Sequence, residues 1–213
     1  MPVSPDHPHV EQHTEGKTRD LPISKELADV LEAAAIAAGI DTVWIYSGGQ
    51  CAKGTCSKRT GSTRHDLGAA ADLHLVSSGS PLDFNKTKDR DVFATFLEAC
   101  AKQGAEGIGA AADYMGSTSA HIGFGGRAVW GRNGKSANAP DWVKRAVATG
   151  WAGRSRTQTE MTDAEEAALI EELIETMPDS PNAEVEPLSD AFSDEQTFGT
   201  RHDYGDDHPD KVE

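Results

Sequence analysis

The sequence predicts an α+β fold in which helices pack on one side of a small antiparallel sheet. Amphipathic stretches with the period of a helix alternate with short apolar runs typical of strands, and Gly-rich turns separate them. The composition, 37% hydrophobic and 26% charged residues, is typical of a globular protein in water. A chain of 213 residues is long enough for one core of ordinary size and an appendage.

Six elements are expected in the main part of the chain. In order they are a helix after Ser24 that Gly39 ends, a strand over 42–46, a strand over 69–76, a helix that Asp89 caps, a strand over 119–124, and a helix from Pro140 to Gly150. In the strand over 69–76, Ala71, Leu73 and Leu75 share one face. Asp72 and His74 therefore share the opposite face.

Charge divides the chain near residue 154. Residues 1–154 balance 17 acidic against 17 basic side chains, whereas residues 155–213 carry 18 acidic and 3 basic ones and account for the net charge of −15. We therefore expect a folded body over residues 18–154 and an acidic tail over residues 155–213. Residues 1–17 show no periodicity, and we expect them to form a mobile arm.

These patterns argue against several classes of partner. Neither the neutral body nor the acidic tail has the basic face that nucleic-acid binding needs. No apolar run approaches the roughly 20 residues that span a bilayer, so we expect no transmembrane segment. The N-terminal residues are polar and lack the apolar core of a signal peptide.

The acidic tail contains one predicted helix, over residues 162–177. It begins with the capping box formed by Thr162 and Glu165 and continues as an apolar stripe. Because a lone amphipathic helix is marginal in water, we expect it to dock on the body or on a larger protein assembly. Beyond Pro178 the composition is typical of a segment that is disordered on its own.

The cysteines leave one question open. Cys51 and Cys56 lie in a Gly- and Lys-rich loop with C-x4-C spacing, which suits either a local disulfide or two free thiols. No second cysteine pair exists to complete a zinc cage. Cys100 falls in a helical pattern and is expected in the core, and the tryptophans that flank the last helix are expected in the core or in a lid.

One short run combines residue types that bind metals. His65 precedes a turn at Gly68 and Asp72 follows it in a strand, so the turn can bring both side chains toward one point. A catalytic zinc ion needs three protein ligands and one open position. His121, in a strand among small residues, is the best candidate for the third ligand, and His74 is its rival because it shares a face with Asp72.

Three segments of the body resemble a known family. The run 65-HDLGAAAD-72 matches the pattern H-x-x-G-x-A-x-D, and 46-YSGG-49 is similar to the family's S-G-Y-R strand end. The run 107-GIGAAADYMGSTSAHIGF-124 resembles the segment that ends in the family's last zinc histidine. Over about residues 20–150 the chain thus resembles the zinc D-alanyl-D-alanine carboxypeptidases and dipeptidases, which supply many phage endolysins.

The resemblance carries several expectations. It implies the metal-binding fold that this family shares with Hedgehog signalling domains. It implies that His65, Asp72 and His121 bind one Zn²⁺ and that water fills the fourth position. Such an ion lowers the pKa of its water and polarises a scissile carbonyl. The implied reaction is hydrolysis of a peptide bond in peptidoglycan stem peptides, near D-alanine.

The chain departs from the family at its general base. The family places a carboxylate three residues before the last histidine or two after it, where this chain has Thr118 and Gly123. Neither residue accepts a proton usefully. Asp113 and Glu106 are the nearest upstream carboxylates and are the candidates for a relocated catalytic base.

A second departure concerns substrate binding. The family's arginine after Ser-Gly-Tyr is replaced by Gln50, which follows Ser47 in the same segment. Both are candidate substrate-binding residues. Arg64 is a third, because it would supply a cation for a substrate carboxylate, and Arg59 is an alternative that suits a solvated loop equally well.

These departures leave two functions open. The first is an active zinc metallopeptidase that degrades the bacterial cell wall, as a phage endolysin in the host cytoplasm until lysis or as a hydrolase carried in the virion. The second is a catalytically degenerate member of the fold that serves as a binding or structural subunit, such as part of a phage tail. The acidic tail favours attachment to an assembly, and loss of the base would lower the rate by about 10²–10⁴.

Overall fold

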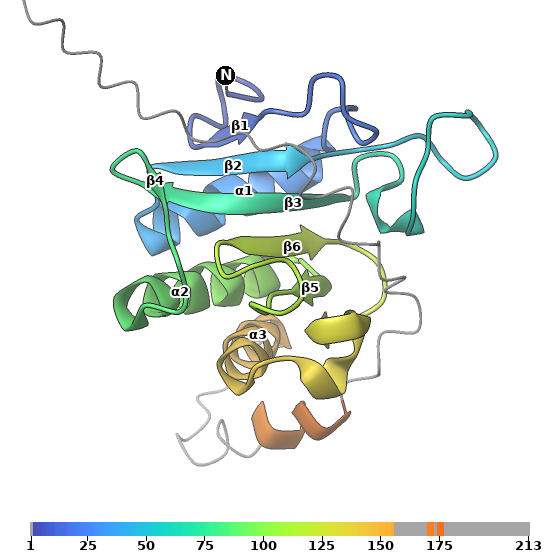
Figure 1. Ribbon diagram of the computed structural model, residues 1–213. Helices are drawn as coiled ribbons and strands as arrows, with labels where there is room; N and C mark the ends of the chain where they lie inside the picture. The colour runs from blue at the N-terminus through green and yellow to red at the C-terminus, as the bar shows by residue number, and fades with distance from the viewer. Residues whose placement is uncertain (1, 156–169, 173, 177–213) are drawn as a thin grey trace, which may run out of the picture.

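The computed structural model describes residues 2–155, 170–172 and 174–176, and it confirms the α+β class (Figure 1). The strands are β1 (Val10–Gln12), β2 (Thr42–Ser47), β3 (Ala70–Ser77), β4 (Ser80–Pro81), β5 (Gly107–Gly109), β6 (Ser119–Gly123) and β7 (Ala128–Trp130). The helices are α1 (Lys25–Ala38), α2 (Thr87–Gln103) and α3 (Asp141–Ser155), with 3₁₀ turns η1 (Thr63–His65), η2 (Arg132–Gly134) and η3 (Ser136–Asn138). The strand order is β1-β2-β3-β6-β5-β7, and β4 pairs with β3.

The sheet is mixed, so the expectation of an antiparallel sheet is wrong. The central pairs β2–β3, β3–β6 and β5–β6 are antiparallel, whereas β1–β2 and β5–β7 are parallel. Helix α1 connects β1 to β2, and a helical crossover returns the chain to the same end of the sheet and makes the pair parallel. The chain reverses direction between β6 and β7, and β7 pairs with β5 on the far side from β6. Because β5 is antiparallel to β6, β7 is parallel to β5.

The described part of residues 1–17, which we expected to form a mobile arm, packs against the body. Residues 10–12 form β1, and the side chain of Val10 is fully buried against the core. Imidazoles of the same segment contact carboxylates of α1: His7 Nε2 lies 2.7 Å from Asp29 Oδ1, and His9 Nδ1 lies 2.6 Å from Glu32 Oε1. A three-residue strand with one buried apolar side chain has no period to detect, which is why the sequence pattern missed it.

Among the described residues, the helices α1 and α2 cover one face of the sheet and leave the other without a helix. In Figure 1, α1 and α2 lie behind the strands, and α2 also packs against α3. Ala71, Leu73 and Leu75 of β3 point into this core and are fully buried, as predicted. The alternate residues of β3, which include Asp72 and His74, therefore point to the face without helices.

Helix boundaries follow the predicted caps in α1 and depart from them elsewhere. The Ser24 hydroxyl accepts from the Leu27 N–H, and Gly39 ends α1 with φ 65°. Helix α2 begins at Thr87, two residues before the expected cap Asp89. Helix α3 continues past Gly150, because that glycine packs against α2, where a Cβ would lie 2.7 Å from the Ala101 Cβ.

The remaining expectations about cysteines and the tail are resolved in part. Cys51 and Cys56 form a disulfide, and Cys100 is buried in the core. In the tail, residues 170–172 and 174–176 are helical, and Glu171 Oε1 lies 2.7 Å from Arg145 Nη1 of α3. The capping box and the rest of the predicted helix lie outside the described residues.

The structure agrees with the sequence on membrane spans. Within the portion that the structure describes, every helix falls short of the length and apolar character that crossing a bilayer demands.

The contribution of β1 to the fold can be measured with one substitution. Val10→Ala removes two buried methyl groups and should lower the free energy of unfolding by about 2 kcal/mol in urea titrations. Val3→Ala removes the same groups from a partly buried position and should cost less. An equal stability for Val10→Ala and wild type would restore the mobile arm.

Candidate metal centre

The functional side chains form one row across the open face of the sheet. The strand register pairs Ser47 with Asp72, Asp72 with His121, His121 with Gly109, and Gly109 with Trp130. Residues that lie directly opposite each other on paired strands point to the same face. Five strands thus place these residues side by side on the face that α1 and α2 leave uncovered.

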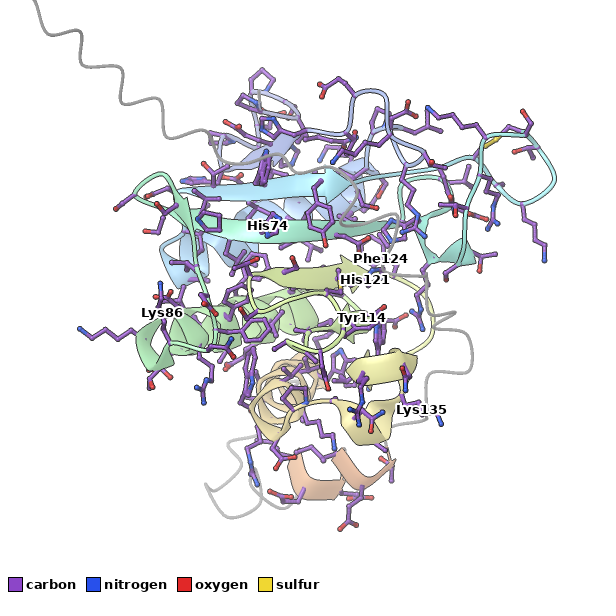
Figure 2. All side chains as sticks on the ribbon, viewed as in Figure 1. His74, Lys86, Tyr114, His121, Phe124 and Lys135 are labelled. Atoms are coloured by element: carbon purple, nitrogen blue, oxygen red, sulfur yellow. A yellow bond between two sulfur atoms is a disulfide. The ribbon has the colours of Figure 1, made fainter. Side chains whose placement is uncertain are left out.

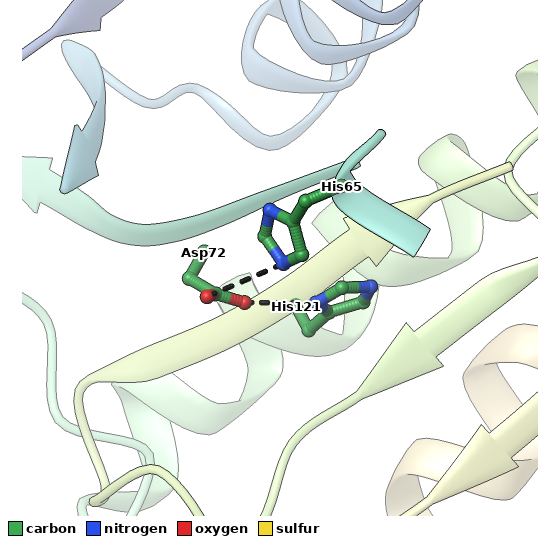
Figure 3. Close-up of side chains that lie close together, drawn as sticks. All are labelled: His65, Asp72 and His121. Atoms are coloured by element: carbon green, nitrogen blue, oxygen red, sulfur yellow. Dashed lines mark hydrogen bonds and ion pairs between the residues drawn. The ribbon is translucent and has the colours of Figure 1, made fainter. Parts of the chain in front are cut away.

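Three members of the predicted metal site come together on this face (Figure 3). His121 Nδ1 lies 2.8 Å from Asp72 Oδ1, and His65 Nε2 lies 3.5 Å from Asp72 Oδ2. One ligand atom from each residue lies within 4.8 Å of the others, and all three residues are buried. The cluster can therefore hold a metal ion between two imidazole nitrogens and a carboxylate.

His65 reaches the row through the turn between η1 and β3. Ser62 Oγ accepts from the Arg64 N–H and caps η1, and Gly68 then turns the chain with φ 76°. A Cβ on Gly68 would lie 2.6 Å from both the Pro22 carbonyl oxygen and the Ser24 nitrogen. Only glycine therefore fits there, which gives the spacing His-x-x-Gly a physical reason.

The hydrogen bonds of the two histidines leave suitable nitrogens facing Asp72. His65 Nδ1 lies 2.9 Å from the Gly48 carbonyl oxygen and, in the neutral ring, donates to it, so Nε2 keeps its lone pair toward the cluster. His121 presents Nδ1 to Asp72 and turns Nε2 away. That Nε2 atom is buried and has no hydrogen-bond partner among the described residues.

Electrostatics keep the cluster in the protonation state that metal binding requires. Burial alone would raise the pKa of Asp72, but the neighbouring His65 and His121 outweigh it and hold that pKa well below its usual range. Burial lowers the pKa of His121 to about 4, against the opposing hydrogen bond to Asp72. Near neutral pH, Asp72 is ionised and His121 is neutral, as metal ligands must be.

His74, the rival ligand, does not join this cluster. Its ring stacks on Trp44 with a centroid distance of 5.4 Å and lies 4.7 Å from the ring of Tyr46. Its Nδ1 lies 2.9 Å from the Thr118 carbonyl oxygen. Figure 2 shows His74 and His121 on neighbouring strands at different positions along the sheet. His74 thus belongs to an aromatic group on the same face and not to the metal cluster.

The structure also brings in Arg19, which the sequence analysis did not identify. Its Nη1 lies 3.4 Å from Ser47 Oγ and 3.4 Å from Asp72 Oδ2, and the side chain is 8% exposed. Arg19 places a buried positive charge at the outer side of the cluster. It lies 53 residues from Asp72 in a segment without periodicity, so no local pattern pointed to it.

The predicted substrate-binding residues Gln50, Ser47 and Arg59 all contact other side chains of the protein. Gln50 is buried, its amide nitrogen donates to the Ser62 carbonyl and to Asp66, and its amide oxygen accepts from the Thr60 N–H. It ties the disulfide loop to η1, and its assignment to the substrate stays a prediction that these hydrogen bonds do not favour. Ser47 is in contact with Arg19 and lies at the end of the row. Arg59 is mostly buried, and its Nη2 lies 2.9 Å from Asp66 Oδ1.

Neither candidate for the catalytic base lies in the cluster. Gly107 points to the same face as His121 by register, so strand alternation turns the preceding Glu106 to the opposite face. Asp113 lies in the loop between β5 and β6, its side chain is 57% exposed, and it pairs with Arg132 at 3.6 Å. The geometry therefore does not favour either residue as the base, and both assignments stay predictions. In the described part of the chain, Asp72 is the one carboxylate of the cluster.

The packing of the sheet explains the missing base at residue 123. A Cβ on Gly123 would lie 2.5 Å from the Ala70 Cβ and 3.0 Å from the Ala69 carbonyl oxygen. Strands β3 and β6 thus approach too closely for a side chain at that point. The other expected position, Thr118, uses its carbonyl to hold His74.

Comparisons with known proteins do not identify a family. No protein-family model matches this chain, and no curated protein is detectably similar to it.

The depressed pKa of His121 predicts how the metal-free protein responds to acid. The unfolded chain binds a proton at this residue below about pH 6.5, whereas the folded protein does so only near pH 4. The unfolded state therefore holds more protons in this window, and stability should fall as the pH falls, by on the order of 3 kcal/mol from this residue.

Urea titrations of the chelator-treated protein between pH 7.5 and about pH 4 measure this dependence. The variant His121→Gln should show a shallower slope, because it lacks the titrating ring. Identical slopes for variant and wild type would contradict the assignment.

Proposed function

We propose that this chain is a zinc-dependent peptidoglycan peptidase that cleaves stem peptides near D-alanine. The buried cluster of His65, Asp72 and His121 is the observation that carries the proposal. Two imidazole nitrogens and one carboxylate are a common ligand set of catalytic zinc ions, which keep a fourth position open. The resemblance of 65-HDLGAAAD-72 to the zinc D-alanyl-D-alanine peptidases supports the substrate and the Hedgehog-like fold.

The geometry of the donors fits a zinc ion. His65 Nε2, the Asp72 carboxylate and His121 Nδ1 would hold it, and the Gly48 carbonyl fixes the ring of His65 in the required tautomer. A zinc ion bound there would supply an activated water and polarise a carbonyl. Arg19 contacts the outer oxygen of Asp72, and its positive charge would stabilise negative charge on a peptide oxygen bound beside the cluster.

A second function is favoured by the missing general base. The described cluster offers no carboxylate besides Asp72, and the backbone at Gly123 leaves no room for one. A zinc site without a base suits a binding or structural subunit that retains the fold. In this alternative, the acidic tail attaches the chain to an assembly such as a phage tail.

The proposal includes a biological setting that follows from the resemblance alone. Phage endolysins and wall-degrading virion proteins belong to the resembled family. We therefore propose a phage-encoded hydrolase that acts at lysis, when it leaves the host cytoplasm, or from the virion.

Removal of a ligand should abolish zinc binding. His65→Ala and His121→Ala should each weaken zinc affinity by more than the roughly 100-fold that follows loss of an outer hydrogen-bond partner. Metal content after dialysis and the zinc-induced rise in melting temperature measure the effect. His74→Ala is the matched control and should retain zinc. Stoichiometric zinc in both ligand variants would exclude the site.

Digestion of purified peptidoglycan tests the activity of the full chain. We expect shortened stem peptides or free D-alanine by mass spectrometry, and we expect chelator or His65→Ala to abolish them. A folded, zinc-loaded protein that yields no product would favour the binding subunit over the peptidase.

A further inference from the structure

The described structure contains two arginine–tryptophan pairs, which differ in whether the indole N–H has a hydrogen-bond acceptor. Arg127 Cζ lies 5.4 Å from the ring centroid of Trp151, and the Trp151 Nε1–H donates to the Ala105 carbonyl at 2.9 Å. Arg64 Cζ lies 4.7 Å from the ring centroid of Trp130. Here the Trp130 Nε1 and Arg64 Nη1 atoms are both buried, and neither has a hydrogen-bond partner in the described structure. The second pair thus presents donors that the described residues leave without an acceptor.

These donors lie at the Trp130 end of the row of residues that contains Asp72 and His121. Trp130 Nε1 lies over Gly109, and Arg64 Nη1 lies over Gly107, so closely that a Cβ on either glycine would collide with them. Gly109 is directly opposite His121, whose ring centroid lies 5.1 Å from that of Trp130. The two glycines therefore let the side chains of Arg64 and Trp130 lie directly on the sheet face beside the metal cluster.

His121 contributes a third buried nitrogen that has no hydrogen-bond partner among the described residues. Its Nδ1 faces Asp72, and its Nε2 is buried on the other side of the ring. A neutral imidazole carries one N–H, and a cation at Nδ1 leaves that proton on Nε2. In the metal-bound protein, His121, Trp130 and Arg64 would all be hydrogen-bond donors.

With a metal ion at His121 Nδ1, the three buried atoms are donors that need an acceptor from outside the described residues. A buried donor that makes no hydrogen bond costs about 1–3 kcal/mol, and more than about 90% of buried polar groups are paired in native structures. The missing partner must supply acceptor oxygens only. Among the described residues, no carboxylate forms an ion pair with the guanidinium of Arg64. An anionic oxygen group placed among these side chains would accept from the donors and balance the charge of Arg64.

We propose that Arg64, Trp130 and His121 form a subsite for a carboxylate group of the ligand, adjacent to the metal cluster. The inference rests on the proposed function, because the metal ion makes His121 a donor. Since one ring serves both sites, binding at the two is coupled. Metal raises the affinity for carboxylate and carboxylate raises the affinity for metal by the same factor, on the order of 10-fold.

Calorimetry on the full chain tests the subsite without measuring activity. Zinc is titrated first, and N-acetylglycine is then titrated into the zinc-loaded and the metal-free protein. N-acetylglycinamide, which lacks the charge, is the ligand control. We expect the carboxylate to bind the zinc-loaded protein at least about 10-fold more tightly than the amide.

Variants separate the subsite from the metal cluster. Trp130→Phe retains an aromatic ring and removes the N–H, and Arg64→Gln removes the charge. Each substitution should lower the affinity for N-acetylglycine about 10- to 100-fold. The affinity for zinc, measured without N-acetylglycine, should stay constant. Arg127→Gln, which alters the other arginine–tryptophan pair, should bind the probe like wild type. Circular dichroism confirms that each variant is folded.

The outcomes distinguish the two levels of the proposal. Wild-type affinity for N-acetylglycine in Trp130→Phe and Arg64→Gln would overturn the subsite, as would equal binding of the amide or an equal loss in Arg127→Gln. Absence of zinc binding in the first titration would instead refute the proposed function and the coupling. Probe binding to the metal-free protein that still depends on Trp130 and Arg64 would support the subsite alone.

Discussion

The buried charge of Asp72 is the constraint on which the site depends. A carboxylate beneath the surface needs positive or hydrogen-bonding partners, and this one has His65, His121 and Arg19 around it. These three partners come from a 3₁₀ turn, a neighbouring strand and the N-terminal segment. Their convergence requires the β3–β6 register, the turn at Gly68 and the packing of residues 2–20 on the body. The same contacts that fold these three segments together therefore also provide the partners of the Asp72 carboxylate.

Close backbone approach is the means by which the sheet makes room for this chemistry. Residues 107, 109 and 123 are glycines on the open face, and each faces an atom that a side chain would displace. At 107 and 109 the space is taken by the donors of Arg64 and Trp130. At 123 it is taken by β3, which tightens the contact between the strands that carry Asp72 and His121. The same closeness removes the position where the resembled family places its base.

The balance of charge around the cluster has consequences for its ligand. Two guanidinium groups, those of Arg19 and Arg64, flank the row at its two ends, and Asp72 is the one carboxylate of the described cluster. A divalent cation there would leave the centre strongly positive. Such a centre attracts anionic groups and stabilises negative charge on a reacting oxygen. It also lacks a strong base, so the peptidase and the binding subunit differ by one proton-accepting group.

The sequence by itself determined most of the helices and strands and the three residues of the candidate metal cluster. The alternation in β3, the cap and stop of α1, and the His-x-x-Gly turn are local, and local periodicity or turn chemistry is enough to read them. The sequence did not reveal strand β1, the parallel strand pairs, the contact of Arg19 with Asp72, or the hydrogen bonds of Gln50 to Ser62 and Asp66. Each of these depends on contacts between segments distant in sequence. Only the tertiary structure decided that Glu106 turns away, that Trp130 leans over Gly109, and that Arg19 reaches Asp72, because strand register and packing are properties of the whole sheet.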